Sequence, residues 1–478
     1  MSGFTRRLQR VHTVRPTDGL PFAMDYTALG LSSKKVFAHY FGPYPRSLND
    51  SMTLATDSYT TAFNNPYYAT YQDYGGMYRD RPIWRPQRGG DYTYLDAVWD
   101  IDQARAVGID GFFCDLLGLS GANYDRYMKL VQAADDMSVG FYVLPMVDAN
   151  GATGAADPIT AADHIRKYSG KNGSYYLPDG RYVVGSFLTE GKTYTWWQQV
   201  FAELQTTWGL DVAFFSVYLN WNQAPNYAGL CYVSSVWGYG ADPGVINAAG
   251  DYKSAATGRG EKFMAPIVSQ DIRPPARVWD EALNTGSLRA AWEKAITQDA
   301  DYAQMVTWSD FSETPMAPSA SNGWVNLDVS SYYISKWKTG QYPSILRDCI
   351  YLSHRPQTLD ATITGPTTLP MSQWVRGSRS TARNYVEALT FLTAPADITI
   401  TSGGSTYTYT APAGMNSAAY PAQLGVQSAV AVRNSQTVAN ILSPVNQRSS
   451  DISQDTGYYR FSSLRGTTGQ FDVLSQYR

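Results

Sequence analysis

The sequence contains few of the residues that build disulfide frameworks and metal centres. It has 3 cysteines and 4 histidines in 478 residues. Cys114, Cys231 and Cys349 lie far apart in the chain, so we expect buried thiols rather than a disulfide framework or a structural zinc site. The histidines are also isolated from one another, which argues against a His-rich metal site. We therefore expect no metal and no cofactor.

The chain also lacks an excess of charge of either sign. Lys and Arg number 38 against 41 Asp and Glu, and no long basic run occurs, which argues against a nucleic-acid partner. No apolar run is long enough to cross a bilayer, so we expect no membrane association. Residues 1–19 are basic but precede no apolar segment, and we expect no classical signal peptide there.

Aromatic residues, in contrast, are abundant. The chain has 36 Tyr and 13 Trp, and 14% of it is aromatic while only 17% is charged. Flat, amphipathic side chains suit a polar, uncharged ligand such as a sugar. The same composition is typical of a β-rich protein, because Tyr and Trp favour strands.

Eight short apolar runs predict the fold of the larger part of the chain. They span residues 36–41, 111–117, 141–147, 182–188, 212–218, 230–236, 263–268 and 303–308. Stretches of helical period separate several of them, as expected for a parallel sheet covered on both faces. Eight such units close most simply into a (β/α)8 barrel, a TIM barrel. An open doubly wound sheet is the alternative, but no Gly-rich turn follows the first run, as dinucleotide binding would require.

After residue 340 the pattern changes to short alternating strands separated by Gly, Pro, Ser and Asn. This pattern predicts an antiparallel β-sandwich. We therefore expect an N-terminal extension over 1–33, a catalytic barrel over 34–340 and an accessory β-sandwich over 341–478.

Polar and aromatic residues at the ends of the predicted strands form the candidate site, because the chemistry of a barrel lies at that face. They are His39, Tyr40, Asp115, Asp148, Glu190, Tyr218, Trp237, Gln270, Trp308, Asp310 and Glu313. Each has an ordinary structural alternative: a turn-forming Asp, a core histidine or a core aromatic.

Two of these acids stand out because glutamate is scarce. Only 7 of the 41 acidic residues are Glu, and five of the seven lie on helical patterns, before a strand or in the predicted sandwich. Glu190 and Glu313 remain, and Glu313 follows Asp310 by three residues. Glycoside hydrolysis needs one carboxylic acid and one carboxylate, so this pair is the catalytic candidate. The alternative is a helix cap, with Asp310 or Ser312 as the cap and Glu313 in the first turn.

The segment from Val306 to Glu313 resembles the Val-Thr-Trp-Asn-Asp-Tyr-Gly-Glu signature of glycoside hydrolase family 71, the α-1,3-glucanases also called mutanases. Further similarities follow in order along most of the chain, at residues 35–40, 102–112, 263–266, 338–343 and 355–356. The signature's Asn and Gly are replaced by Ser309 and Ser312. The family also commonly has Asn at the position of Asp115.

The resemblance implies a barrel followed by a sandwich and hydrolysis of α-1,3-glucan with inversion, by an endo-acting enzyme. It places the essential acids at Asp310 and Glu313. We expect Glu313 to be the general acid and Asp310 the base that activates water, and the opposite assignment is the alternative. Inversion predicts carboxyl groups roughly 6.5 to 9.5 Å apart. His39, Asp148 and Trp237 would contact the substrate, and Asp115 is a further candidate.

Two other functions are compatible with the sequence. The chain could be a hydrolase of another hexose polymer, or a polysaccharide-binding or virion structural protein without turnover. Family members are typically secreted, so we expect action outside the cell, through association with a phage particle or release by lysis. The sequence does not specify an oligomeric state.

Overall fold

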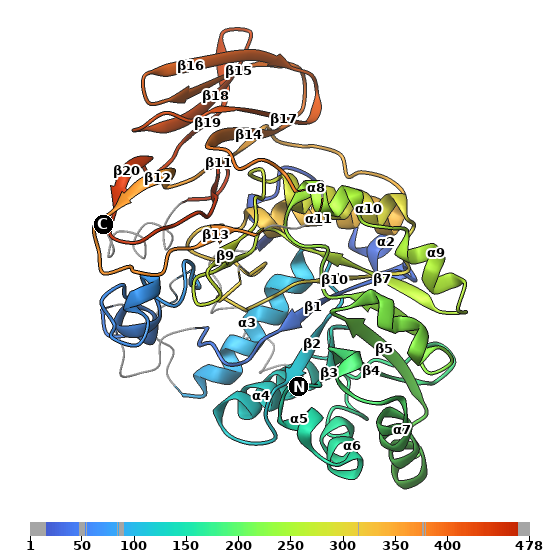
Figure 1. Ribbon diagram of the computed structural model, residues 1–478. Helices are drawn as coiled ribbons and strands as arrows, with labels where there is room; N and C mark the ends of the chain where they lie inside the picture. Colours follow the sequence, from blue (N-terminus) through green and yellow to red (C-terminus); the bar gives the residue numbers. More distant parts are fainter. Residues whose placement is uncertain are drawn as a thin grey trace.

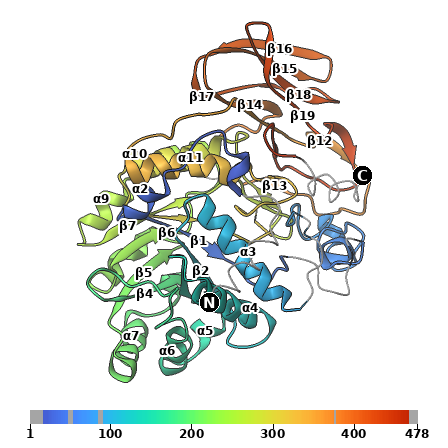
Figure 2. The same ribbon diagram turned by 180° about the vertical axis from the view of Figure 1, so that it is seen from behind.

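The computed structural model describes residues 16–46, 53, 55–83, 85, 90–313, 315–374, 377 and 379–466. Its centre is a closed barrel of parallel strands, surrounded by helices, with antiparallel sheets stacked on one side (Figures 1 and 2). The (β/α)8 barrel and the C-terminal sandwich predicted from the sequence are confirmed. No helix in the described part of the chain combines the length and apolar character needed to cross a bilayer.

The barrel strands coincide with the eight apolar runs. They are β1 (Lys35–Tyr40), β2 (Gly111–Leu116), β3 (Tyr142–Asp148), β4 (Tyr182–Phe187), β5 (Val212–Tyr218), β6 (Val233–Val236), β7 (Lys262–Ile267) and β10 (Tyr302–Met305). Each strand pairs in parallel with its neighbours, and the pairing of β1 with β10 closes the barrel.

Helices cover the outside of the barrel. They are α3 (Tyr92–Ala106), α4 (Ala122–Met137), α5 (Ala152–Ala155), α6 (Pro158–Arg166), α7 (Tyr194–Trp208), α8 (Pro243–Ala248), α9 (Tyr252–Thr257), α10 (Gly286–Thr297) and α11 (Val325–Thr339). Several begin where the chain supplies a cap: Asp91 accepts a hydrogen bond from the backbone N–H of Tyr94, and Thr193 accepts one from that of Trp196.

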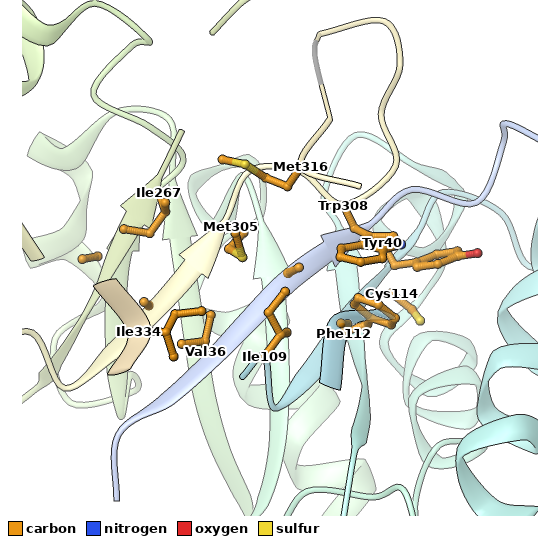
Figure 3. Packing of buried hydrophobic residues seen from close by; sticks show 14 of the residues in the cluster. Val36, Tyr40, Ile109, Phe112, Cys114, Ile267, Met305, Trp308, Met316 and Ile334 are labelled. Carbon is orange, nitrogen blue, oxygen red and sulfur yellow. The ribbon is translucent and has the colours of Figure 1, made fainter. Parts of the chain in front are cut away.

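Alternation along the strands divides the barrel core into two layers, because successive side chains point to opposite faces. Phe37, Phe113 and Phe215 lie in the cluster that fills the barrel interior. Val36, Phe112 and their neighbours face outward and pack under the helices (Figure 3). A side chain at the end of a strand can therefore reach the barrel mouth only if it belongs to the inward set.

Two antiparallel four-stranded sheets form the C-terminal sandwich. The first has the order β17-β14-β11-β21 and the second the order β16-β15-β18-β19. Their strands are β11 (Cys349–His354), β14 (Tyr385–Leu392), β15 (Ala396–Ser402), β16 (Ser405–Ala411), β17 (Gly414–Pro421), β18 (Gln427–Arg433), β19 (Gln436–Leu442) and β21 (Tyr459–Ser462). Aliphatic side chains from both sheets, such as Ile350 and Ile398, form the core between them. A separate parallel pair joins β12 (Gln357–Ile363) to β20 (Arg448–Asp451).

The C-terminal part is joined to the barrel by strands and by buried polar contacts. After β7 the chain forms β8 (Ile272–Arg273) and β9 (Val278–Trp279), and β9 pairs with β13 (Ser372–Gln373) from the C-terminal part. Arg460 on β21 is 1% exposed and donates hydrogen bonds to the side chains of Ser269 and Asn326. At the other end of the chain, α2 (Tyr26–Leu31) packs on α11, and Phe22 forms an isolated bridge with Ile345.

Candidate active site

Inward-facing polar residues from three neighbouring strands converge at the C-terminal mouth of the barrel. His39 on β1 and Asp115 on β2 follow the inward-facing Phe37 and Phe113 by two residues, and Asp148 ends β3 after the inward-facing Met146. All three are at most 8% exposed. The structure thus brings these three predicted residues together.

A series of hydrogen bonds across the barrel holds His39 in place. Its Nε2 lies 2.7 Å from Oε1 of Gln304, whose Nε2 donates to the Ser235 hydroxyl on β6. Burial lowers the pKa of His39 to about 4, in spite of the hydrogen bond with Gln304, so the imidazole is neutral near pH 7. Its Nδ1 is buried and has no partner among the described residues. That nitrogen is available to a ligand hydroxyl.

The segment after β10 carries the predicted acid pair. The backbone N–H of Asp310 donates to the Thr307 hydroxyl, and Oδ1 of Asp310 accepts from both the backbone N–H and the hydroxyl of Ser312. These bonds fix the carboxyl group, which is 8% exposed. Burial raises the pKa of Asp310, although the bonds from Ser312 and the charge of Arg273 oppose the shift.

Glu313 lies beside an arginine that another acid holds in place. Arg273 on β8 makes a bidentate pair with Asp271, with both N···O distances 2.7 Å, and its third nitrogen lies 3.2 Å from Oε1 of Glu313. The guanidinium at this distance stabilises the charged form of the glutamate. The side chain of Glu313 is 25% exposed, so a ligand can reach it.

Electrostatic interactions connect Asp115 with the other acids. Burial raises the pKa of Asp115 well above its usual range, and the negative charges of Asp148 and Asp310 add to the rise. Asp148 itself has a pKa raised by burial, but its Oδ1 accepts a hydrogen bond from the backbone N–H of Asn150. Three carboxyl groups therefore interact in one partly desolvated space.

Aromatic and polar side chains line the next part of the mouth. Trp237, just after β6, is half-buried and makes edge-on contacts with His39 and Phe187, each at a centroid distance of 4.5 Å. Glu190, after β4, accepts a hydrogen bond from the backbone N–H of Asn220, while its second carboxylate oxygen is buried without a partner among the described residues. Both predicted residues lie at the C-terminal ends of the strands.

Three aromatic residues that were predicted to contact the substrate are buried away from the barrel mouth. Tyr40 belongs to the outward set of β1 and its hydroxyl donates to the buried Asp100 on α3. Tyr218 is fully buried on the outward face of β5, with its hydroxyl 3.4 Å from the Cys231 sulfur. Trp308 is 0% exposed and packs on Phe112, so it has no face available to stack on a sugar (Figure 3). The structure therefore provides no support for ligand contact by these three.

The side chain of Gln270 binds the C-terminal part of the chain and is not free to bind a ligand at the barrel mouth. Its Oε1 accepts a hydrogen bond from the backbone N–H of Tyr458, just before β21.

Two residues of the site were not predicted from the sequence. Gln304 lies inside an apolar run, and only its inward register would have marked it. Arg273 follows a predicted strand end, but no spacing rule connects it to Glu313.

The donor set does not suggest a metal centre. Within the described ranges, no group of three or more His, Cys, Asp and Glu side chains is arranged to hold an ion. The arrangement instead presents two carboxyl groups after β10 with polar groups around them, and carboxyl groups are the residue type that glycoside hydrolysis uses.

A family model describing glycosyl hydrolase family 71 matches residues 87–470. The chain belongs to this family. It is a glycoside hydrolase, as the resemblance of the segment from Val306 to Glu313 predicted.

Individual proteins give more distant similarities. Glucan endo-1,3-alpha-glucosidase agn1 of Schizosaccharomyces pombe is 24% identical over 410 residues, which cover 79% of this chain and 92% of that protein. Among solved structures, an endo-alpha-mannosidase of family GH99 from Bacteroides thetaiotaomicron is 14% identical with a TM-score of 0.49, and covers 64% of this chain and 97% of that one. A second structure of that mannosidase has a TM-score of 0.47 at 13% identity, over 64% of this chain and 98% of that one.

Proposed function

We propose that this glycoside hydrolase cleaves α-1,3-glucan within the chain and inverts the configuration at the anomeric carbon. The family and the name of the fission-yeast relative, a glucan endo-1,3-alpha-glucosidase, support this choice of substrate. The observation that carries the chemistry is the position of the two acids after β10, where Asp310 interacts electrostatically with Asp115 at the barrel mouth and Glu313 pairs with Arg273.

In the proposed reaction, Glu313 gives a proton to the glycosidic oxygen as the bond to the anomeric carbon breaks. Asp310 takes a proton from a water molecule, whose oxygen attacks the same carbon from the opposite face. Inversion by this route leaves room for water between carboxyl groups roughly 6.5 to 9.5 Å apart. The bonds from Ser312 hold Asp310 in one orientation for this step.

One observation favours the reverse assignment of roles. Arg273 stabilises the charged form of Glu313, whereas burial raises the pKa of Asp310 and favours its protonated form. In that case Asp310 is the acid and Glu313 the base. A glucosyl fluoride separates the two assignments, because its leaving group needs no acid. Of Asp310→Asn and Glu313→Gln, the variant that lacks the general acid should still hydrolyse the fluoride. The variant that lacks the general base should not.

The substrate contacts that we propose are His39, Asp148, Glu190 and Trp237. Nδ1 of His39 and the unpartnered oxygen of Glu190 are suited to sugar hydroxyls, and the exposed part of Trp237 offers an aromatic surface to a sugar ring. Tyr40, Tyr218, Gln270 and Trp308 are left out because each is engaged elsewhere.

The first test is release of reducing ends from insoluble α-1,3-glucan, with α-1,4-, α-1,6- and β-1,3-glucans alongside. Release from the first substrate alone, abolished in Asp310→Asn and Glu313→Gln, is the expected result. Release from a different polymer would identify a hydrolase of another linkage. Binding without release by any of the proteins would instead indicate a polysaccharide-binding protein.

We also propose that the enzyme acts outside the cell, where polysaccharide is accessible, after association with a phage particle or release by lysis. Mass spectrometry of purified particles and of culture supernatant tests this, with the cytosolic fraction as reference. Recovery from the cytosolic fraction alone would contradict it.

A further inference from the structure

Asp115 is the acid at the barrel mouth that the proposed mechanism does not use. It faces the interior of the barrel from the end of β2, between β1, which carries His39, and β3, which carries Asp148. It is 8% exposed. It is therefore both deeply placed and next to groups that we propose to contact the substrate.

The carboxyl group of Asp115 lacks the hydrogen bonds that the neighbouring carboxyl groups of Asp148 and Asp310 accept. Oδ1 of Asp115 is buried and has no hydrogen-bond partner among the described residues. Asp148 and Asp310, in contrast, each accept hydrogen bonds from nearby N–H or O–H groups. A buried polar atom without a partner is costly, so its presence at a ligand site needs an explanation.

The charges around Asp115 do not compensate an ionised carboxylate. The acids that act on it are Asp148 on β3 and Asp310 beyond β10. Cys114 on its own strand and Tyr127 on α4 are the other titratable groups that interact with it, and both have a raised pKa. No Lys or Arg within the described ranges forms an ion pair with it.

We propose that Asp115 carries a proton in the resting enzyme and donates it in a hydrogen bond to an oxygen of the bound sugar, which makes it a specificity-determining residue. Its O–H then supplies a donor where an ionised carboxylate would supply only acceptors. The raised pKa of the group agrees with this charge state. The inference rests on the proposed function, since it assigns Asp115 to the same site.

Two substitutions test the role of the proton. Asp115→Asn keeps the shape and a neutral donor, whereas Asp115→Leu removes the donor. In the wild type, KM should rise with increasing pH as Asp115 loses its proton and becomes a charge beside Asp148 and Asp310. In Asp115→Asn this alkaline rise should disappear, at a cost of no more than about 5-fold in kcat/KM at acidic pH. Asp115→Leu should raise KM roughly 10-fold or more at all pH values, as expected for loss of a buried hydrogen bond.

Three results would overturn the proposal. A loss of 100-fold or more in kcat at every pH in Asp115→Asn would mean that the residue works as an ionised carboxylate. An unchanged KM in Asp115→Leu would mean that it does not contact substrate. An alkaline rise of KM that persists in Asp115→Asn would assign the titration to another group. Asp360→Asn, at an exposed position on β12, is the matched control and should leave all of these quantities unchanged.

A measurement on the free enzyme keeps this inference separate from the proposed function. Infrared difference spectra between wild type and Asp115→Asn should contain the carbonyl band of a protonated carboxylic acid at neutral pH. Its absence would contradict the proposal even if Asp115→Leu fails to fold. Full activity of Asp310→Asn and Glu313→Gln would instead refute the proposed function and leave the infrared result standing.

Discussion

Arg273 connects three acids of the site, and its charge acts on both members of the proposed catalytic pair. It pairs with Asp271 and Glu313, and its charge lowers the pKa of Asp310 against the effect of burial. Arg273→Gln removes that charge, so the pKa of Asp310 should rise further. The limb of the kcat/KM profile that reports Asp310 should therefore move to higher pH, which a pH–rate series measures. Arg277→Gln is a nearby control, and an unmoved profile in Arg273→Gln would contradict the expectation.

His39 should make the stability of the protein sensitive to acid. Its pKa is about 4 in the folded state and about 6.5 when unfolded, so the folded protein favours the neutral ring. Its stabilising contribution is complete above pH 6.5 and is lost as the pH falls toward 4, by roughly 1.4 kcal/mol per pH unit at most.

Urea unfolding between pH 4 and pH 7 checks this expectation. His39→Gln, which has no titrating ring, should show a shallower fall in the free energy of unfolding over the same range. Equal slopes for the two proteins would show that other groups cause the acid sensitivity.

For single residues, the sequence predicted which residue types lie near the strand ends but not always the face of the strand from which their side chains project. His39 and Asp115 were predicted at strand ends and lie at the mouth. Tyr40 and Tyr218 were predicted on the same grounds and face the helices instead. A shift of one residue along a strand reverses the face, so proximity to a strand end alone does not determine which side chains reach a ligand.

Strand β21 contacts the barrel part of the chain through a buried arginine. Arg460 is buried and donates to Ser269, to Asn326 and to the backbone carbonyl of Asn284. Arg460→Met leaves these acceptors buried without donors, and the free energy of unfolding should fall by about 3 kcal/mol. Chemical denaturation measures it.

A half-buried arginine at the surface provides the comparison. Arg181→Met breaks a surface pair with Asp179 and should change the free energy of unfolding by less than about 1 kcal/mol. A similar small effect in Arg460→Met would mean that the buried contacts contribute little.

Long elements were easier to predict than short ones. All eight barrel strands follow from apolar runs, because strands buried on both faces leave a continuous signal. Strands β8, β9 and β13 have two residues each and leave no periodic signal. Their partners are also far away in the sequence, so no local pattern specifies the sheet that they form.

The whole molecule should unfold as one unit. The proposed boundary between a barrel over 34–340 and a sandwich over 341–478 is crossed by the pairing of β9 with β13, the buried ion pair of Arg355 with Glu281, and the contacts of Arg460. Cooperative contacts of this kind couple the two parts. Differential scanning calorimetry should give a single transition with equal calorimetric and van't Hoff enthalpies. Two separate transitions would show that the parts are thermally independent.

The hydrogen bond between Gln270 and Tyr458 also has a consequence for biosynthesis. Gln270 directly precedes Asp271, which holds the arginine beside Glu313, and its partner Tyr458 is synthesised 188 residues later. A nascent chain that already contains the whole barrel still lacks this support. Hydrolytic competence should therefore arise only after Tyr458 has left the ribosome.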